Sequence, residues 1–260
     1  MSLGIINRYN LTILVDYSWA LYRGAFRFKE FCVINQNGRI LTGALFGILQ
    51  MTELLCQNYP EAQIIFCLDG KPIERQKLFP GYKASRKTTS ETPAPEEIQF
   101  AKALYNEPFK MLGGIPNVSA VYAEEKEADD LIAKLAILNR EAGRDVVIFT
   151  SDKDMLQLMQ YGANVSKEIS DGELVLLGEE YTLSHKDLGV EPKHIPYYRP
   201  WKGDASDDIP GAVKAVLSDI LREIAIAWYD SGKNELDETL MDQLIAQAGM
   251  KCNNIVTGKH

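Results

Sequence analysis

The sequence predicts an α/β fold with helices on both faces of a mostly parallel central sheet. Three short runs, residues 11–15, 63–68 and 145–150, are almost continuously apolar, which is typical of parallel strands buried on both faces. Segments with helical periodicity, residues 41–58 and 127–142, lie between these runs. Strands that alternate with helices imply crossover connections and therefore a parallel sheet.

The composition predicts a folded chain with a sizeable core. Of its 260 residues, 46% are hydrophobic, yet no stretch approaches the ~20 apolar residues that span a bilayer. We expect no signal peptide, no membrane partner and a soluble, cytoplasmic protein. The four cysteines form no CxxC pair, so neither a zinc site nor a disulfide framework is expected. The net charge of −8, taken alone, argues against nucleic-acid binding.

Two regions depart from the strand–helix alternation. Residues 70–95 are rich in proline, lysine and arginine, which favours a functional loop or arch over core. A helix is expected over residues 96–112. Later, a turn marked by glycine and proline precedes two helical stretches, 212–230 and 236–248. The expected parts are an α/β core over residues 1–182, with an arch segment at about 70–112, and a helical region over residues 183–260.

Acidic side chains follow each of the three predicted strands. Asp16, Asp69 and Asp152 come at or just after the strand ends. Ligands bind beyond the carboxyl ends of parallel strands, so these carboxylates should lie at one edge and repel one another unless a cation lies between them. Further acids should join them from two nearby motifs: Glu127, Asp129, Asp130 and Asp154.

Each acid, taken singly, also has an ordinary structural explanation. An aspartate after a strand often caps a helix, and acids favour a helix N-terminus. Their convergence instead favours Mg²⁺ or Mn²⁺ over zinc, because hard cations prefer oxygen ligands. Two such ions about 3.5–4 Å apart can clamp the attacking and leaving oxygens of a phosphodiester displacement. The sequence lacks GxGxxG, GxSxG and HExxH motifs, and none of its three histidines neighbours a credible nucleophile.

Several short motifs occur in order along residues 11–211. They are Val15-Asp16 with Ala20-Leu21-Tyr22-Arg23, Phe66-Cys67-Leu68-Asp69-Gly70, Phe79-Pro80-Gly81-Tyr82-Lys83-Ala84-Ser85-Arg86, Glu127-Ala128-Asp129-Asp130, Thr150-Ser151-Asp152-Lys153-Asp154, and Gly203-Asp204-Ala205-Ser206-Asp207-Asp208-Ile209-Pro210-Gly211. Together they resemble the structure-specific 5′ nucleases: flap endonucleases, bacteriophage 5′–3′ exonucleases and the 5′ nuclease domain of bacterial DNA polymerase I. The resemblance implies a PIN-like fold with a helix–three-turn–helix module, and a bacterial or bacteriophage origin.

The resemblance also implies a divalent-metal-dependent nuclease that cuts DNA at 5′ ends, flaps or junctions. Two Mg²⁺ ions, replaceable by Mn²⁺, would be bound. The first would be served by Asp16, Asp69, Glu127 and Asp129 with Asp130 nearby, and the second by Asp152, Asp154, Asp204 and Asp207. Lys83 and Arg86 would act on the scissile phosphate as catalytic groups. The residues implied to contact DNA are Arg23, Tyr82, Lys83, Arg86, Lys87 and Lys214.

The sequence departs from the family pattern around the Gly203–Gly211 motif. The family usually has Asn where Asp208 stands, and a glycine-rich hairpin that often binds K⁺ after Gly211. Here residues 212–219 keep Lys214 without the glycines, which argues for a helix and against a K⁺ site. If nine of the 36 acidic residues bind metal ions, the rest of the chain is nearly neutral. The net charge of −8 then no longer argues against nucleic-acid binding.

Two alternatives stay open at this point. One is a ribonuclease of the same broad fold, and the other is a catalytically weak module that binds branched DNA. The balance between exonuclease and flap endonuclease activity is also open. Replication or repair proteins are candidate partners of a kind that the sequence does not identify.

Overall fold

The structure is a computed structural model, and it describes residues 10–36, 38–85, 94–211, 218–233, 239, 240 and 243. The chain divides into two units. The first comprises Met1–Ile73 with Ser90–Leu177, and the second Glu74–Thr89 with Gly178–His260. The expected arch segment, residues 70–112, is therefore divided between the two units.

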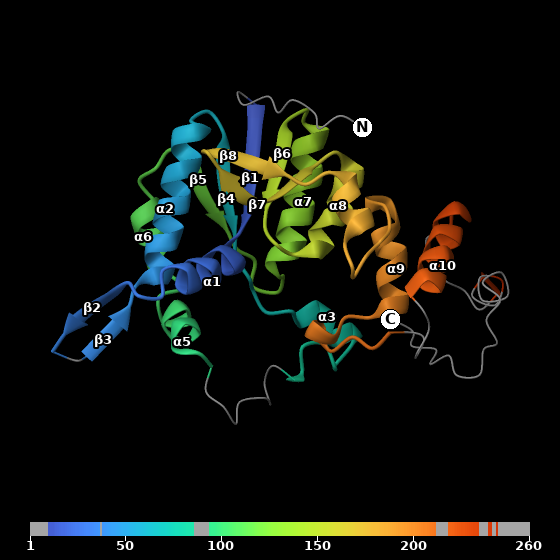
Figure 1. The fold of residues 1–260 in the computed structure, drawn as a ribbon, viewed down its shortest axis with the longest axis horizontal. Coiled ribbons are helices and arrows are strands. Elements are labelled where there is room, and N and C mark those ends of the chain that lie inside the picture. Colours follow the sequence, from blue (N-terminus) through green and yellow to red (C-terminus); the bar gives the residue numbers. More distant parts are fainter. Residues whose placement is uncertain are drawn as a thin grey trace. The chain divides into compact units, whose positions relative to one another are not determined.

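A six-stranded sheet forms the centre of the first unit (Figure 1). Its order is β5 (Val118–Val121), β4 (Gln63–Cys67), β1 (Leu11–Asp16), β6 (Asp145–Phe149), β7 (Asn164–Ser170) and β8 (Glu173–Leu176). All neighbours pair in parallel except β7 and β8. The predicted mostly parallel sheet is confirmed, and the three apolar runs form the adjacent strands β4, β1 and β6.

Helices cover both faces of this sheet, as expected. One layer contains α1 (Tyr17–Arg27), α2 (Gly43–Asn58), α5 (Glu96–Ala103) and α6 (Glu107–Leu112), and α7 (Ala128–Glu141) lies on the opposite face (Figure 1). Alternate residues of β1 explain this arrangement. Ile13 joins the core beneath α1 and α2, whereas Thr12 bonds Asn139 of α7. The unit is completed by η2 (Lys153–Tyr161) and by a hairpin of β2 (Cys32–Asn35) and β3 (Gly38–Leu41).

The single helix expected over residues 96–112 is wrong, because the chain forms two helices there. Pro108 supplies the reason. A proline lacks the N–H that would bond the carbonyl four residues earlier, and its ring clashes with that carbonyl. The carbonyl concerned is that of Leu104, which instead accepts from the N–H of Glu107 in a tighter turn. Helix α5 therefore ends at Ala103 and α6 begins at Glu107.

The described part of the second unit consists mainly of short helices. They are α3 (Ile73–Leu78), α8 (Glu179–Ser184), η3 (Pro192–His194), α9 (Ile195–Lys202), η4 (Ala205–Asp207) and α10 (Ser218–Asp230). The rings of Trp201 and Trp228 pack α9 against α10. Residues 212–217, and nearly all of the predicted helix over 236–248, lie outside the described residues. Among the helices that the structure describes, none combines the length and apolar character needed to cross a membrane.

We expect Gly47→Ala to destabilise the first unit. Helices α1 and α2 cross closely at Gly24 and Gly47, where a Cβ on Gly47 would lie 2.4 Å from the Cα of Gly24. Overpacking of this kind lowers the free energy of unfolding by about 1–3 kcal/mol. Urea denaturation measures the change. Gly114→Ala is the matched control, because no atom lies within 4 Å of its added Cβ. Equal stabilities of the two variants would contradict the close crossing.

Candidate functional site

Three of the predicted site acids come from adjacent strands of the sheet. Asp16 is the last residue of β1, Asp69 follows β4, and Asp152 follows β6. In the register of the sheet, Asp16 lies opposite Cys67, and Val15 lies opposite Phe149. The carboxyl ends of the three strands therefore meet at one edge, where the sequence analysis places these acids.

Asp16 lies at the centre of this edge and also caps α1. Its Oδ1 accepts from the backbone N–H of Trp19 at 3.1 Å, and its Oδ2 accepts from the Thr150 hydroxyl at 2.9 Å. Burial nevertheless raises the pKa of the Asp16 carboxyl to about 6; both hydrogen bonds oppose the rise, and the charges of Asp69 and Asp152 add to it. Asp69 and Asp152 are thus close enough to Asp16 to disfavour its charged form.

The Thr150 hydroxyl links the ends of β1 and β6. Besides donating to Asp16, it accepts from the backbone N–H of Asp152 at 3.1 Å. The side chain of Asp152 in turn caps η2 by accepting from the N–H of Asp154 at 2.8 Å. Sequence reasoning assigned no role to Thr150. Its position between a buried strand and an acid is the signal that identifies it.

Asp69 is held in place by two donors from other elements. Its Oδ1 accepts from the backbone N–H of Ala128 at 2.9 Å, and its Oδ2 from the Ser18 hydroxyl at 2.5 Å. Gly70 makes this possible, because a Cβ there would lie 2.1 Å from the carbonyl oxygen of Ala123. The chain after β4 thus lies against the loop before α7, which brings Asp69 to the start of that helix. Ser18 is a second site residue that the sequence analysis missed.

The acids at the start of α7 stabilise the helix terminus and are also candidate site residues. Glu127 is buried, and its backbone N–H donates to Oδ2 of Asp130 at 3.1 Å, which closes the first turn of the helix. Asp129 and Asp130 are half-buried beside it. The N–H of Ala128 at the same helix terminus donates to Asp69, so the start of α7 lies near the sheet edge.

The oxygen-only donor set of this edge suits Mg²⁺ or Mn²⁺. Within the part of the chain that the structure describes, no three Asp, Glu, His or Cys side chains form a ready-made metal cage. Mg²⁺ does not require one, because it usually keeps several waters and takes only one or two carboxylates from the protein. The residues therefore fit an ion that is held largely through water.

In the second unit, the Gly203–Gly211 motif forms a compact turn. Asp204 caps η4 by accepting from the N–H of Ser206 at 2.9 Å, and its other oxygen lies 3.0 Å from Nη2 of Arg199. Asp208 has a left-handed backbone with φ 59°, a conformation that Asp and Asn tolerate better than most residues. Gly203 is required as well, since a Cβ there would lie 2.3 Å from the backbone nitrogen of Gly211.

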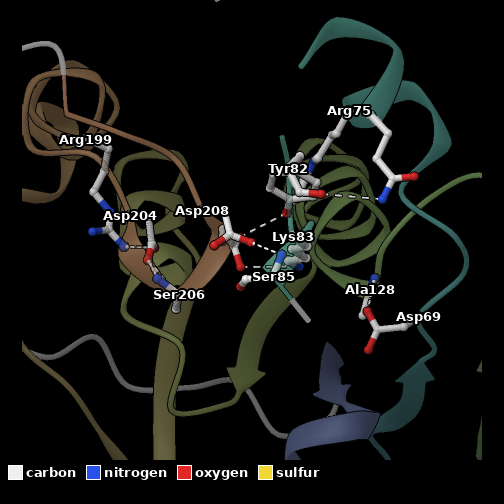
Figure 2. Close-up of polar contacts among 12 residues, drawn as sticks. Asp69, Arg75, Tyr82, Lys83, Ser85, Ala128, Arg199, Asp204, Ser206 and Asp208 are labelled. Atoms are coloured by element: carbon white, nitrogen blue, oxygen red, sulfur yellow. Dashed lines mark hydrogen bonds and ion pairs between the residues drawn. The ribbon is translucent and has the colours of Figure 1, made fainter. Parts of the chain in front are cut away.

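The predicted catalytic lysine belongs to a polar network around this turn (Figure 2). The Nζ of Lys83 lies 3.6 Å from Oδ1 of Asp207, and its backbone N–H donates to the Asp207 carbonyl. The buried Tyr82 hydroxyl donates to Oδ2 of Asp207 at 3.0 Å and accepts from Arg75 at 2.9 Å. The N–H of Ser85 donates to the carboxylate of Asp208. Tyr82 therefore anchors the segment, and a direct DNA contact by its side chain stays a prediction.

The other predicted contacts with DNA are described only in part. Arg23 donates to the backbone carbonyl of Lys167 at 3.3 Å and lies over the ring of Trp19. Arg86, Lys87 and Lys214 lie outside the described residues.

Comparisons with known proteins agree on a family. Residues 11–185 match the family of the 5′–3′ exonuclease N-terminal resolvase-like domain. A 5′–3′ exonuclease of Buchnera aphidicola subsp. Schizaphis graminum is 34% identical over 209 residues, which cover 78% of this chain and 65% of that protein. DNA polymerase I of Chloroflexus aurantiacus is 33% identical over 213 residues, covering 78% of this chain and 21% of the polymerase. The chain thus spans just under two thirds of that exonuclease and about a fifth of that polymerase.

Similar solved structures show the same fold. The 5′-exonuclease of phage T5 with bound zinc has a TM-score of 0.60 at 17% identity, covering 92% of this chain and 85% of that one. The bacteriophage T5 flap endonuclease, in a pseudo-enzyme–product complex with DNA and metal ions, gives a TM-score of 0.59 with the same identity and coverage. The predicted fold class is confirmed.

We expect Asp16→Asn to stabilise the metal-free protein at neutral and alkaline pH. The folded protein holds the Asp16 proton with a pKa of about 6, against 3.8 for the ordinary carboxyl, so wild-type stability falls as the pH rises between these values. The amide carries no charge, its single oxygen can still accept from the Trp19 N–H, and its NH2 group can donate to the Thr150 hydroxyl oxygen. The gain should be on the order of 2 kcal/mol at pH 8 and should shrink towards pH 4.

Urea denaturation in EDTA at both pH values measures this gain. Asp171→Asn, a change at an exposed turn, is the matched control. A variant that is no more stable than wild type at pH 8 would contradict the raised pKa of the Asp16 carboxyl.

Proposed function

We propose that this chain, which belongs to the 5′–3′ exonuclease family, is a divalent-metal-dependent nuclease that hydrolyses DNA at 5′ ends, flaps or junctions. The observation that carries the proposal is the meeting of Asp16, Asp69 and Asp152 at the ends of three adjacent strands. Burial, with the charges of Asp69 and Asp152 adding to it, raises the pKa of the Asp16 carboxyl, and a bound cation would stabilise its charged form. The Buchnera relative is itself a 5′–3′ exonuclease.

The groups that we propose to serve divalent cations in the first unit, directly or through water, are Asp16, Asp69, Glu127, Asp129, Asp130, Asp152 and Asp154. Mg²⁺ is the expected ion and Mn²⁺ the expected substitute, because both prefer oxygen ligands. A pair of such ions would activate a water and stabilise the departing oxygen. The presence of two ions, and the assignment of Asp204 and Asp207 to the second, follow from the family resemblance.

The chain's own residues would orient these carboxylates. Thr150 restrains Asp16 and the backbone of Asp152, and Ser18 restrains Asp69. Such restraint keeps the ligands in place before substrate arrives, so that little reorganisation is required during reaction. Hydrogen bonds of this kind around metal ligands commonly tune both affinity and activity.

Lys83 is the proposed electrophilic group for the phosphoryl oxygens, with Arg86 beside it in sequence. The Lys83 ammonium pairs with Asp207 and lies over the Tyr82 ring, whose centre is 4.9 Å from Nζ. These contacts would restrict the Lys83 side chain to few rotamers before substrate binds. A positioned cation stabilises charge that develops in the transition state. The proposed DNA contacts are Arg23, Tyr82, Lys83, Arg86, Lys87 and Lys214.

Asp69→Asn and Asp152→Asn should abolish cleavage while leaving the fold intact. Each amide can still accept the backbone hydrogen bond that its carboxylate accepts, but it no longer offers a charged ligand. The assay is cleavage of an end-labelled 5′ flap, a blunt duplex and single-stranded DNA, each with Mg²⁺ and with EDTA. Glu61→Gln, on the exposed surface, is the control and should cut normally.

Three results decide the proposal. Cleavage by Asp152→Asn at the wild-type rate would exclude the metal-site assignment. Absence of cleavage by wild type on every substrate with Mg²⁺ or Mn²⁺ would exclude the nuclease. Faster cleavage of a matched RNA flap would favour the ribonuclease alternative.

Lys83→Ala should lower turnover far more than binding. Loss of one positioned donor to a transition state costs about 100-fold or more in rate, whereas a single lysine contributes little to a footprint of many phosphates. Single-turnover cleavage at saturating protein and a binding titration in EDTA separate the two effects. Lys77→Ala removes an exposed charge from the same segment and serves as the control. Weakened binding with an unchanged single-turnover rate would mean that Lys83 only contacts the phosphate backbone of DNA and has no catalytic role.

A further inference from the structure

Tyr105 lies in the short turn between α5 and α6 of the first unit. It owes this position to Pro108, which prevents one continuous helix across the two segments. Tyr105 is half-buried, and its hydroxyl oxygen lies 3.5 Å from Oγ of Ser18. The same serine hydroxyl donates to Oδ2 of Asp69. The break between the helices therefore brings an aromatic hydroxyl to within two hydrogen bonds of a proposed metal-site carboxylate.

Tyr17 holds Tyr105 in this position. The hydroxyl of the buried Tyr17 donates to the backbone carbonyl of Tyr105. The two rings also meet edge to face, a favoured arrangement of aromatic pairs, with centroids 4.9 Å apart. Neither contact involves the Tyr105 hydroxyl. Packing within the first unit thus fixes the backbone and the ring of Tyr105, and with them the place of its hydroxyl beside Ser18.

The direction of the contact between Ser18 and Tyr105 follows from the donors available. A serine hydroxyl has one proton, and a carboxylate only accepts, so the Ser18 proton is directed to Asp69. The Ser18 oxygen can then only accept from Tyr105, whose hydroxyl is a donor. The three groups form a chain in which Tyr105 donates to Ser18 and Ser18 donates to Asp69. Hydrogen bonds in such a chain strengthen one another.

Asp69 depends on this orientation because its side chain is exposed. Close packing does not restrict an exposed carboxylate, so its hydrogen bonds must do so. One oxygen accepts from the backbone N–H of Ala128, which is fixed at the start of α7, and the other from Ser18, whose hydroxyl can rotate. A donor from Tyr105 restricts that rotation. A ligand that is held in its binding orientation loses less freedom when it binds.

We propose that Tyr105 is a positioning residue that raises the divalent-cation affinity of Asp69 through Ser18. The proposal rests on the proposed function, since it requires that Asp69 serve a cation directly or through water. Tyr105 acts only through Ser18, so it should change the affinity for the cation and leave the chemical step unchanged. The turn between α5 and α6, where the sequence predicts a continuous helix, is then part of the metal site's support.

Calorimetric titration of the full chain with Mn²⁺, in the absence of DNA, tests the proposal. Tyr105→Phe removes the hydroxyl and keeps the ring and the carbonyl that Tyr17 contacts. We expect the affinity for Mn²⁺ to fall about threefold, the effect of one modest hydrogen bond. Ser18→Ala should lower it about tenfold, the low end for a direct partner of a metal ligand. Tyr161→Phe removes the hydroxyl of an exposed ring and is the matched control, which should bind as wild type does.

A double variant separates action through Ser18 from a packing defect. In the presence of Ser18→Ala, Tyr105→Phe should cause no further loss of affinity, because its hydroxyl no longer has a serine to act on. The Mg²⁺ concentration for half-maximal cleavage of a 5′ flap should rise about threefold in Tyr105→Phe, in step with the lost affinity. The single-turnover rate at saturating Mg²⁺ should match that of wild type, whereas a distorted fold would lower this rate as well.

The outcomes distinguish this proposal from the proposed function. Tyr105→Phe that binds Mn²⁺ as tightly as wild type, or that weakens binding equally with and without Ser18→Ala, overturns the positioning role alone. Wild type that binds no Mn²⁺ overturns it together with the proposed metal site. Binding of Mn²⁺ by wild type that weakens in Tyr105→Phe only while Ser18 is present supports the positioning role, whether or not the protein cuts DNA.

Discussion

Electrostatic repulsion at the carboxyl edge of the sheet is the constraint on which the site depends. Parallel pairing of β4, β1 and β6 brings Asp69, Asp16 and Asp152 together, and Asp16 at the centre is partly buried. Hydrogen bonds from Trp19 and Thr150 stabilise the Asp16 charge, but burial and the neighbouring acids outweigh them and raise its pKa to about 6. A fold selected for stability alone would avoid this arrangement, whereas a fold that binds cations requires it.

Helix capping and the proposed cation binding are compatible explanations of the same aspartates. Asp16, Asp152 and Asp204 each accept a hydrogen bond from the backbone at the start of a helix. Asparagine caps helices about as well as aspartate and carries no charge. Capping accounts for the hydrogen bonds, and a helix N-terminus favours a negative charge, but neither explains why Asp16, Asp69 and Asp152 meet at one edge of the sheet. The cation binding that we propose would account for the charge, and the cap supplies a fixed orientation to the same carboxylate.

The sequence predicts the central strands well and the edge of the sheet poorly, for a physical reason. Strands β1, β4 and β6 are buried on both faces, so their apolar runs are continuous. Strand β7 has the sequence Asn-Val-Ser-Lys-Glu-Ile-Ser and only part of it is buried, so its pattern resembles that of a loop. The site acids lie in local motifs that can be recognised. Thr150 and Ser18 could not be assigned, because their partners Asp16 and Asp69 are distant in sequence and are brought near by strand pairing.

Asp208 stands where the family pattern usually has asparagine, and its surroundings in the second unit accommodate the change. Asp208 has a left-handed backbone, and its side chain accepts from the Ser85 N–H. Asparagine could do both, so the change from asparagine to aspartate leaves the turn intact. The substitution adds a negative charge next to Asp207. The positive charges of Lys83 and Arg75, joined to Asp207 directly or through Tyr82, offset that addition. The segment from Arg75 to Ser85 thus holds the turn, and contact with phosphate is its proposed second role. The residues that hold the turn have a fixed geometry in the protein alone.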